Sequence, residues 1–348
     1  MSIRLGSRFA TSRSGFTYFV AAWGTMRAGV ETGAASITRP PARASARKRI
    51  TRRLSGVVTS KNVLDKVAVW DACHVPWMPE LFTVPALQKL EEKRHRQFET
   101  VPYFDGVVTG QFDALVESFA GEPELYHPIR GRIRGERAFR QYLADTNAWL
   151  SERNISIEDV EHITRGRGGF EEVVLHLDGG NGPIGLPVAI TGNRLPDGRI
   201  VELRIYYSSR PLVGTHLNRA PLLQPDPDVR TSDVIADYQR ALAAGDVDAI
   251  VAAFEPDGYA REPGGAERVH TGPDALRAFY ERRFSNGGGI QLEHCAVVDD
   301  GRACVLEYNL VRWGKTELPP EAGMAVYIRG ESGKLAAART YDDVNPPI

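Results

Sequence analysis

The sequence predicts an α+β fold that is present in two consecutive copies. In the C-terminal third of the chain, three helical patterns precede an antiparallel meander of strands, which places the helices on one face of the sheet. The same pattern occurs earlier at a fixed offset. Tyr103, Gly110, Asp113, Ala114 and Phe119 recur at one constant separation as Tyr238, Gly245, Asp248, Ala249 and Phe254. An offset maintained across several elements indicates an internal repeat.

The second copy shows its elements most clearly. Apolar residues at helical spacing predict a first helix that Gly245 ends, and Asp246 is a good N-cap for a second helix from Val247 to Phe254. A third helix is expected after a capping box from Thr271 to Asp274, with Pro273 in its first turn. Alternation and turns predict four strands: Ile290–Val298, Arg302–Trp313, Gly323–Arg329 and Leu335–Asp343.

The first copy has matching strands and a separate lead-in. Its expected strands are Val173–Leu177, Leu186–Thr191 and Ile200–Tyr207, and a polar helix is expected from Pro85 to Glu99. The repeat also extends to the last strand of each copy, where Arg204 and Tyr206 recur at the same offset as Arg339 and Tyr341. The predicted organisation is a tail at 1–77, copy one at 78–217, a Pro-rich linker at 218–232 and copy two at 233–348.

Charge separates the tail from the rest of the chain. Residues 1–61 contain twelve Lys or Arg and a single acidic residue, Glu31, which leaves the remainder with a net charge of about −12. This composition predicts a disordered basic tail and an acidic folded body that does not bind nucleic acid. The apolar run Gly15–Met26 also leaves open a signal peptide or a transit peptide, and translation from Met78 is a third interpretation.

The chain contains no segment long enough to span a membrane, so a cytoplasmic protein is expected. Its three cysteines, Cys73, Cys295 and Cys304, lack zinc-type spacing and are interpreted as reduced thiols. Gly287-Gly-Gly is not followed by Lys-Ser/Thr, and no nucleophile motif or pair of histidines at metal-binding spacing occurs. The sequence therefore predicts a protein that works without a metal or cofactor.

Copy two resembles the ketosteroid isomerases of the nuclear transport factor 2-like, or SnoaL-like, superfamily. The resemblance lies in Tyr238 before Gly245-Asp246, in Ala260-Arg-Glu-Pro-Gly-Gly, in Gly272 with Asp274-Ala-Leu-Arg-Ala-Phe-Tyr280, and in the end from Ala338 to Asn345. It implies two tandem cone-shaped α+β barrel domains, in each of which a curved antiparallel sheet wraps on three helices. An apolar pocket would open at the mouth of the cone. Such cones pair through their sheets, which implies an intramolecular pseudo-dimer or a homodimer.

The resemblance also assigns candidate catalytic residues. In these isomerases a carboxylate removes a proton next to a ketone, and a tyrosine and a protonated Asp stabilise the enolate. Glu262 matches the base and Tyr238 matches the tyrosine, and His127 and Tyr103 hold the equivalent positions in copy one. The position of the second enolate-stabilising donor falls near Ala325, which has no proton to give.

Each candidate has a structural alternative. Glu262 could be an exposed turn carboxylate, Tyr238 an ordinary core residue, and His127 a surface or hydrogen-bonded histidine. Arg204, Tyr206, Arg339 and Tyr341 recur in both copies, which indicates an architectural role. Further candidates are Glu307 and Asn309, which could face either pocket or solvent; His294; and Asp342 or Asp343, either of which could supply a second acid.

The leading functional hypothesis is a cofactor-independent enzyme, an isomerase or cyclase, that acts on a small apolar carbonyl metabolite of the polyketide or terpenoid kind. Glu262 would be its general base and Tyr238 its hydrogen-bond donor. The alternative is a tandem protein without catalytic activity that binds a small ligand or has a structural role. This superfamily contains both enzymes and binding proteins, so the pocket chemistry must decide between them.

Overall fold

The computed structural model describes residues 102–180 and 182–347. All of these residues belong to one unit. The predicted tail, the polar helix at 85–99, the start at Met78 and Cys73 lie outside the described residues.

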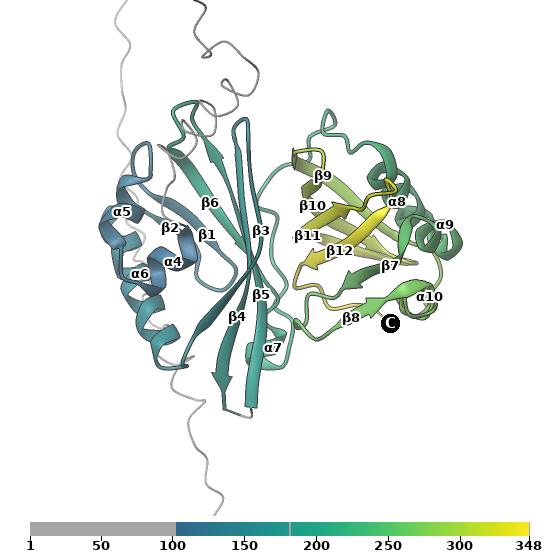
Figure 1. Cartoon of the computed structure of the whole chain (residues 1–348), viewed down its shortest axis with the longest axis horizontal. Coiled ribbons are helices and arrows are strands. Elements are labelled where there is room, and N and C mark those ends of the chain that lie inside the picture. Colours follow the sequence, from purple (N-terminus) through teal and green to yellow (C-terminus); the bar gives the residue numbers. More distant parts are fainter. Residues whose placement is uncertain (1–101, 181, 348) are drawn as a thin grey trace, which may run out of the picture. The chain divides into compact units, whose positions relative to one another are not determined.

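The described part of copy one contains helices and a six-stranded sheet (Figure 1). Its helices are α4 (Tyr103–Val108), α5 (Phe112–Glu117), α6 (Glu136–Ser151) and the short α7 (Arg210–Val213). Its strands are β1 (Glu124–His127), β2 (Gly131–Arg134), β3 (Ser156–Arg165), β4 (Gly168–Gly179), β5 (Gly182–Arg194) and β6 (Ile200–Tyr206).

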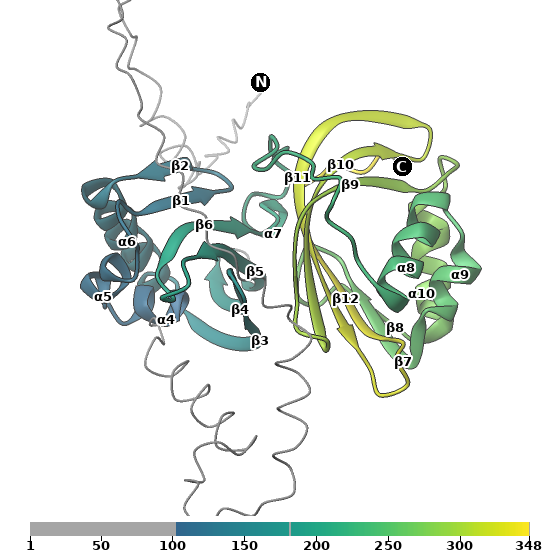
Figure 2. The ribbon, with the colours of Figure 1, turned by 90° about the horizontal axis from the view of Figure 1, so that it is seen from above.

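Copy two has the same order of elements as copy one, apart from the short α7. Its helices are α8 (Asp233–Ala244), α9 (Val247–Ala252) and α10 (Gly272–Arg283). Its strands are β7 (Phe254–Arg261), β8 (Val269–Thr271), β9 (Ile290–Asp299), β10 (Ala303–Trp313), β11 (Thr316–Arg329) and β12 (Leu335–Tyr341). The strand orders β2-β1-β6-β5-β4-β3 and β8-β7-β12-β11-β10-β9 are identical. Helices cover one face of each sheet (Figure 2).

The predicted α+β fold class is confirmed, with one correction to the sheets. The sheets are open and do not close into barrels. They also contain both parallel and antiparallel pairs of strands, whereas antiparallel sheets were expected. Strand β12 pairs with β7 in parallel, and β6 pairs with β1 in the same way. A parallel pair needs a long connection, and here the segment that contains α10 and the meander supplies it. The alternation of apolar and polar residues cannot distinguish parallel from antiparallel pairing, because side chains alternate with a period of two in both.

The predicted helix boundaries in copy two hold at Gly245, Asp246 and Thr271. Gly245 ends α8 with a left-handed φ of 73°, and the Asp246 side chain accepts a 3.0 Å hydrogen bond from the Ala249 N–H. The second helix ends at Ala252 rather than at Phe254, because Phe254 is the first residue of β7. Thr271 is the N-cap of α10, but the expected capping box is absent, because its side chain makes no capping hydrogen bond. Thr271 is the last residue of β8 and pairs with Tyr259, so the sheet sets its conformation.

The sheet faces that the helices leave uncovered pack against each other through a shared apolar cluster. Its members include three pairs of residues related by the repeat offset: Phe170 and Val305, Ala189 and Met324, and Tyr206 and Tyr341. Equivalent residues therefore meet across the contact, as they do in a two-fold symmetric dimer.

Two buried ion-pair clusters lie in the same contact and repeat the symmetry. Glu307 of copy two binds the Arg204 guanidinium through two hydrogen bonds of 2.6 and 2.7 Å, and the Tyr206 hydroxyl donates to it at 2.8 Å. The reciprocal cluster consists of Glu172 of copy one, which binds Arg339 through two hydrogen bonds of 2.7 Å and also accepts from Tyr341 and Arg261. The two glutamates are themselves related by the repeat offset. These contacts agree with an architectural role for the recurring Arg and Tyr residues.

The expectation that Glu307 and Asn309 face either a pocket or solvent was therefore wrong. Glu307 is part of the contact between the sheets, and the Asn309 side chain donates to the Leu223 carbonyl at 3.1 Å. The alternation along the strand was correct, but the face that is solvated in many sheets is covered here.

The linker at 218–232 lies along copy two. The Asp226 N–H donates to the His294 carbonyl at 2.9 Å, and the Asn218 side chain donates to Glu321 at 2.8 Å. Cys295 and Cys304 are buried free thiols, as expected. No helix within the described ranges is long and apolar enough to cross a membrane.

We predict that Glu172→Ala lowers the free energy of unfolding by about 3–5 kcal/mol, because it leaves the buried Arg339 guanidinium without its counterion. Urea unfolding of the full chain measures this change. Glu136→Ala, which removes an exposed carboxylate paired with Arg140, is the control and should change stability by less than about 0.5 kcal/mol. Equal effects of the two variants would show that the buried cluster does not hold the two sheets together.

Candidate active site

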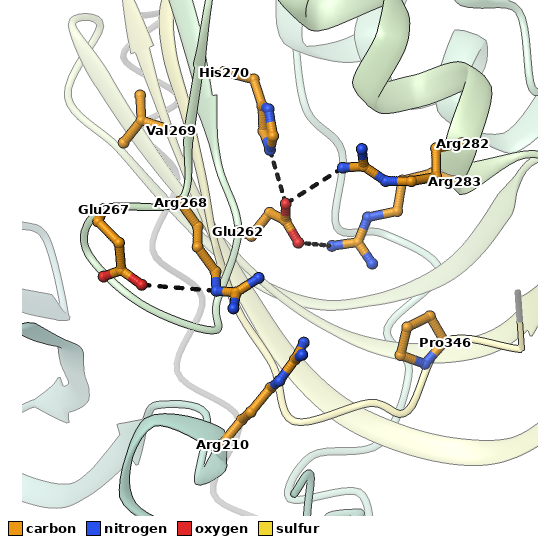
Figure 3. Close-up of a pocket in the computed structure, with 9 residues that line it drawn as sticks. All are labelled: Arg210, Glu262, Glu267, Arg268, Val269, His270, Arg282, Arg283 and Pro346. Carbon is orange, nitrogen blue, oxygen red and sulfur yellow. Dashed lines mark hydrogen bonds and ion pairs between the residues drawn. The ribbon is translucent and has the colours of Figure 1, made fainter. Parts of the chain in front are cut away.

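Copy two contains two neighbouring cavities. The inner cavity, about 60 Å³ in volume, lies inside the cone, and its wall is mostly aromatic and aliphatic. The outer cavity, about 440 Å³, is lined largely by charged residues (Figure 3). Glu262 and Arg283 line both cavities, so they mark the boundary between an apolar and a cationic environment.

Tyr238 projects from α8 into the inner cavity. Its hydroxyl lies 2.7 Å from the Tyr280 hydroxyl, and its ring contacts the rings of Phe254 and Tyr327. Burial raises the pKa of Tyr238 to about 12. The hydroxyl therefore keeps its proton at neutral pH and can donate a hydrogen bond.

Glu262 directly follows β7, and its side chain is 17% exposed, so it is not the open turn carboxylate that the sequence left possible. It accepts a 2.7 Å hydrogen bond from His270 Nε2, and Arg283 approaches it at 3.5 Å. Burial acts to raise its pKa, but His270, Arg283 and Arg282 outweigh that effect, and the pKa falls below its usual value. Glu262 is therefore a carboxylate at neutral pH, available as a hydrogen-bond acceptor.

His270 and the arginines of this site were not identified from the sequence. His270 lies on β8 opposite Ala260, and its ring stacks on Phe279 at 4.3 Å with an angle of 15° between the planes. Had a short hairpin been predicted after Glu262-Pro263, it would have placed His270 beside the Glu262 carboxylate. The sequence signal was weak because β8 has only three residues.

Asp342 supplies a second carboxyl group in the inner cavity. Its Oδ2 accepts a 3.0 Å hydrogen bond from the Tyr308 hydroxyl. Burial raises its pKa, although Arg283 and the hydrogen bond from Tyr308 oppose this effect, so Asp342 is shifted toward the neutral acid. Ala325 also lines the cavity and offers no proton.

Asp343, the neighbouring candidate, has a different environment. It accepts hydrogen bonds from Ser208 at 2.8 Å and from the Leu217 N–H at 2.8 Å, and His216 Nδ1 lies 3.0 Å away. Burial acts to raise its pKa, but these hydrogen bonds lower it overall. Asp343 is absent from the lining of both cavities and fixes the segment that carries α7.

In copy one, Tyr103 and His127 do not line a common cavity. Tyr103 lines a cavity of about 1010 Å³ that His127 does not reach, and its hydroxyl donates to Tyr142 at 3.1 Å. Both ring nitrogens of His127 are engaged: Nδ1 accepts from two backbone N–H groups, and Nε2 lies 3.4 Å from the Tyr207 hydroxyl. Burial, with Arg130 and Arg219, lowers its pKa to about 3. These contacts favour a structural role for His127.

No group of three or more His, Cys, Asp or Glu side chains in the described parts of the chain is arranged to hold a metal ion. His294 is half-buried, and burial and Arg230 lower its pKa, but it lines neither cavity.

Comparison with family models found one that matches most of copy two. Residues 235–338 match the family model of the SnoaL-like domain, which covers the helices and nearly all of the sheet of copy two. No curated protein matches the chain.

Several solved structures are similar to one copy of the fold. One is a putative polyketide cyclase from Sinorhizobium meliloti, with 18% identity over 32% of this chain and 94% of that chain and a TM-score of 0.27. Another is a hypothetical protein with a ketosteroid isomerase-like fold from Catenulispora acidiphila, with 14% identity, coverage of 34% and 90%, and a TM-score of 0.29. A third is the epoxide hydrolase/cyclase-like enzyme SalBIII, with 17% identity, coverage of 34% and 90%, and a TM-score of 0.26.

The lowered pKa of Glu262 predicts a pH-dependent contribution to stability. A carboxylate with a folded pKa below its unfolded value stabilises the fold above the unfolded pKa, and this stabilisation disappears as the pH falls through the folded pKa. The stability difference between wild type and Glu262→Gln should therefore be larger at pH 7 than at pH 3. Urea unfolding at both values measures it. A difference that grew toward pH 3 would contradict the ion pairing described for Glu262.

Proposed function

We propose that copy two is a cofactor-independent enzyme that transfers a proton at a carbon next to a carbonyl group, in an isomerisation or a cyclisation. The observation that carries the proposal is the inner cavity, where the carboxylate of Glu262 shares one aromatic enclosure with Tyr238 and Asp342. A base and two hydrogen-bond donors in an apolar enclosure are what enolate formation needs.

In this proposal Glu262 removes the proton. Its carboxylate takes a proton from the carbon next to the carbonyl, and the electron pair of that C–H bond moves into the carbonyl to form an enolate. The same carboxyl group, now protonated, returns the proton to another carbon of the enolate in an isomerisation. His270 holds Glu262 in position through its 2.7 Å hydrogen bond. A carboxylate with a low pKa is a weak base. Glu262 is therefore expected to act on a substrate whose C–H bond is relatively acidic.

Tyr238 and Asp342 would stabilise the enolate oxygen. Tyr238 keeps its proton because burial raises its pKa, and the raised pKa of Asp342 favours a carboxyl group that can donate. Asp342 would thereby replace the second hydrogen-bond donor to the enolate, which Ala325 cannot provide. A hydrogen bond to developing charge in a dry cavity is much stronger than one in water.

The size of the inner cavity supports a second candidate function. A volume of about 60 Å³ is small, because cavities for small-molecule ligands span about 300–1,000 Å³. If the cone does not widen, copy two would act as a binding module through its larger outer cavity. The two functions differ in one measurable property: only the enzyme would exchange a carbon-bound proton of the ligand with solvent.

Glu262→Gln should lower the rate of α-proton exchange by about 10²–10⁴-fold, because the amide cannot accept the proton. Exchange into D₂O, measured by NMR on the full chain, would use a 3-keto-Δ5-steroid and the smaller ketone 2-tetralone. Glu267→Gln is the matched control, because Glu267 lines the outer cavity alone. Unchanged exchange in Glu262→Gln would exclude Glu262 as the base, and no exchange by the wild type would leave the binding function.

Tyr238→Phe and Asp342→Asn should each reduce the exchange rate, by about 10²–10³-fold for the tyrosine, which is the usual effect of removing one donor to an enolate oxygen. Asp342→Asn keeps a donor and should have the smaller effect. Circular dichroism and urea unfolding would establish that both variants remain folded. A rate for Tyr238→Phe within a factor of two of wild type would restrict this residue to the core.

A further inference from the structure

The outer cavity contains more positive than negative groups. Four arginines line it, against the two carboxylates of Glu262 and Glu267. Glu262 is already engaged with His270, Arg282 and Arg283. Two arginines, Arg210 and Arg268, therefore remain to be neutralised by Glu267 alone.

Neither of these two arginines is satisfied by that carboxylate. Glu267 lies 3.8 Å from Arg268 Nε, and this buried nitrogen has no hydrogen-bond acceptor. Among the residues that the structure describes, none forms a hydrogen bond or an ion pair with the Arg210 guanidinium. An unpaired guanidinium at the wall of a cavity is a site for an anion, because Arg binds carboxylates and phosphates through a planar set of donors.

The two guanidinium groups extend into the same space (Figure 3). Their side chains flank Gly264, and the Cδ atoms of Arg268 and Arg210 lie 3.3 and 3.7 Å from the point where a β-carbon at position 264 would stand. The two guanidinium groups carry like charges at the wall of one cavity, and an anion bound between them would reduce their repulsion.

The position of Arg210 is fixed by a contact between the two copies. Arg210 begins α7, which follows the last strand of copy one, while Arg268 belongs to copy two. Asp343 of copy two accepts hydrogen bonds from Ser209 before α7 and from Leu217 after it. Copy one thereby contributes a residue to the mouth of the cone of copy two.

Two arginines of this cavity, Arg282 and Arg283, are not part of the repeated architecture. In the alignment of the third helices, where Gly135 stands opposite Gly272, Asp145 and Thr146 occupy their positions. The contact between the sheets, in contrast, retains Glu, Arg and Tyr in both copies. The loss of these two arginines from copy one is consistent with a function that only copy two performs.

We propose that the outer cavity binds an oxyanion, a carboxylate or phosphate, on the substrate of copy two, and that Arg210 and Arg268 recognise it. This inference rests on the proposed function and narrows its substrate to an anionic carbonyl compound. The anionic group occupies the outer cavity, and the carbonyl group reaches past Glu262 toward the inner one. The arginines thereby act in binding and leave proton transfer to Glu262.

A matched pair of ketones tests this inference. 4-Oxo-4-phenylbutanoate carries a carboxylate, and its primary amide is neutral and of nearly the same size. Isothermal titration calorimetry on the full chain should show that the acid binds at least tenfold more tightly than the amide, with a preference that weakens as salt is added. Phenyl phosphate, added as a competitor, tests the phosphate alternative.

Arg210→Gln and Arg268→Gln should each reduce the preference for the acid at least threefold and leave the affinity for the amide unchanged. Arg277→Gln is the control, since Arg277 lies on α10, pairs with Asp248 and does not line the cavity. Equal binding of acid and amide by the wild type would overturn the inference. An acid preference that survives in both arginine variants would do the same.

The same probes separate this inference from the proposed proton transfer. Selective binding of the acid without α-proton exchange would support the anion site and contradict the catalytic role of Glu262. If the α-protons of the neutral amide exchange in a reaction that depends on Glu262, and the acid is not bound more tightly than the amide, the result would contradict the anion site and support the catalytic role.

Discussion

The pairing of buried glutamates with arginines across the two sheets constrains the rest of the structure. Glu172 and Glu307 are almost fully excluded from solvent, and a buried carboxylate is costly unless a cation and several donors surround it. Each glutamate finds these groups on the other copy. Within the contact, the loss of any one of these partners would therefore leave a buried charge without its counterion.

This constraint explains which features the two copies share. The residues of the contact between the sheets recur at one fixed offset, because each copy supplies both halves of a reciprocal contact. The cone interiors are under no such constraint. His127 in copy one is engaged by backbone groups and by Tyr207, whereas Glu262 at the equivalent position in copy two lies between two cavities. The sheets thus preserve a common scaffold on which one interior carries the candidate site.

The candidate site derives its chemistry from a sharp change of environment. On one side of Glu262 the wall is aromatic, and burial raises the pKa values of Tyr238 and Asp342. On the other side, His270 and arginines keep Glu262 ionised. Groups with pKa values moved in opposite directions within one site are typical of acid–base catalysis. The segment fixed by Asp343 connects this site to copy one.

The sequence by itself determined the repeat and most of the helices and strands of copy two, because turns, caps and periodicity are local signals. It pointed to Glu262 and Tyr238 only through the resemblance to the ketosteroid isomerases. It indicated an architectural role for Arg204 and Arg339 from their recurrence alone, but it did not identify their partners. Only the tertiary structure decided the parallel pairing of β7 with β12, the contacts of Glu172 and Glu307, and the approach of His270 and Arg210 to one site. These features depend on strand register and on contacts between residues far apart in the chain, which no local pattern encodes.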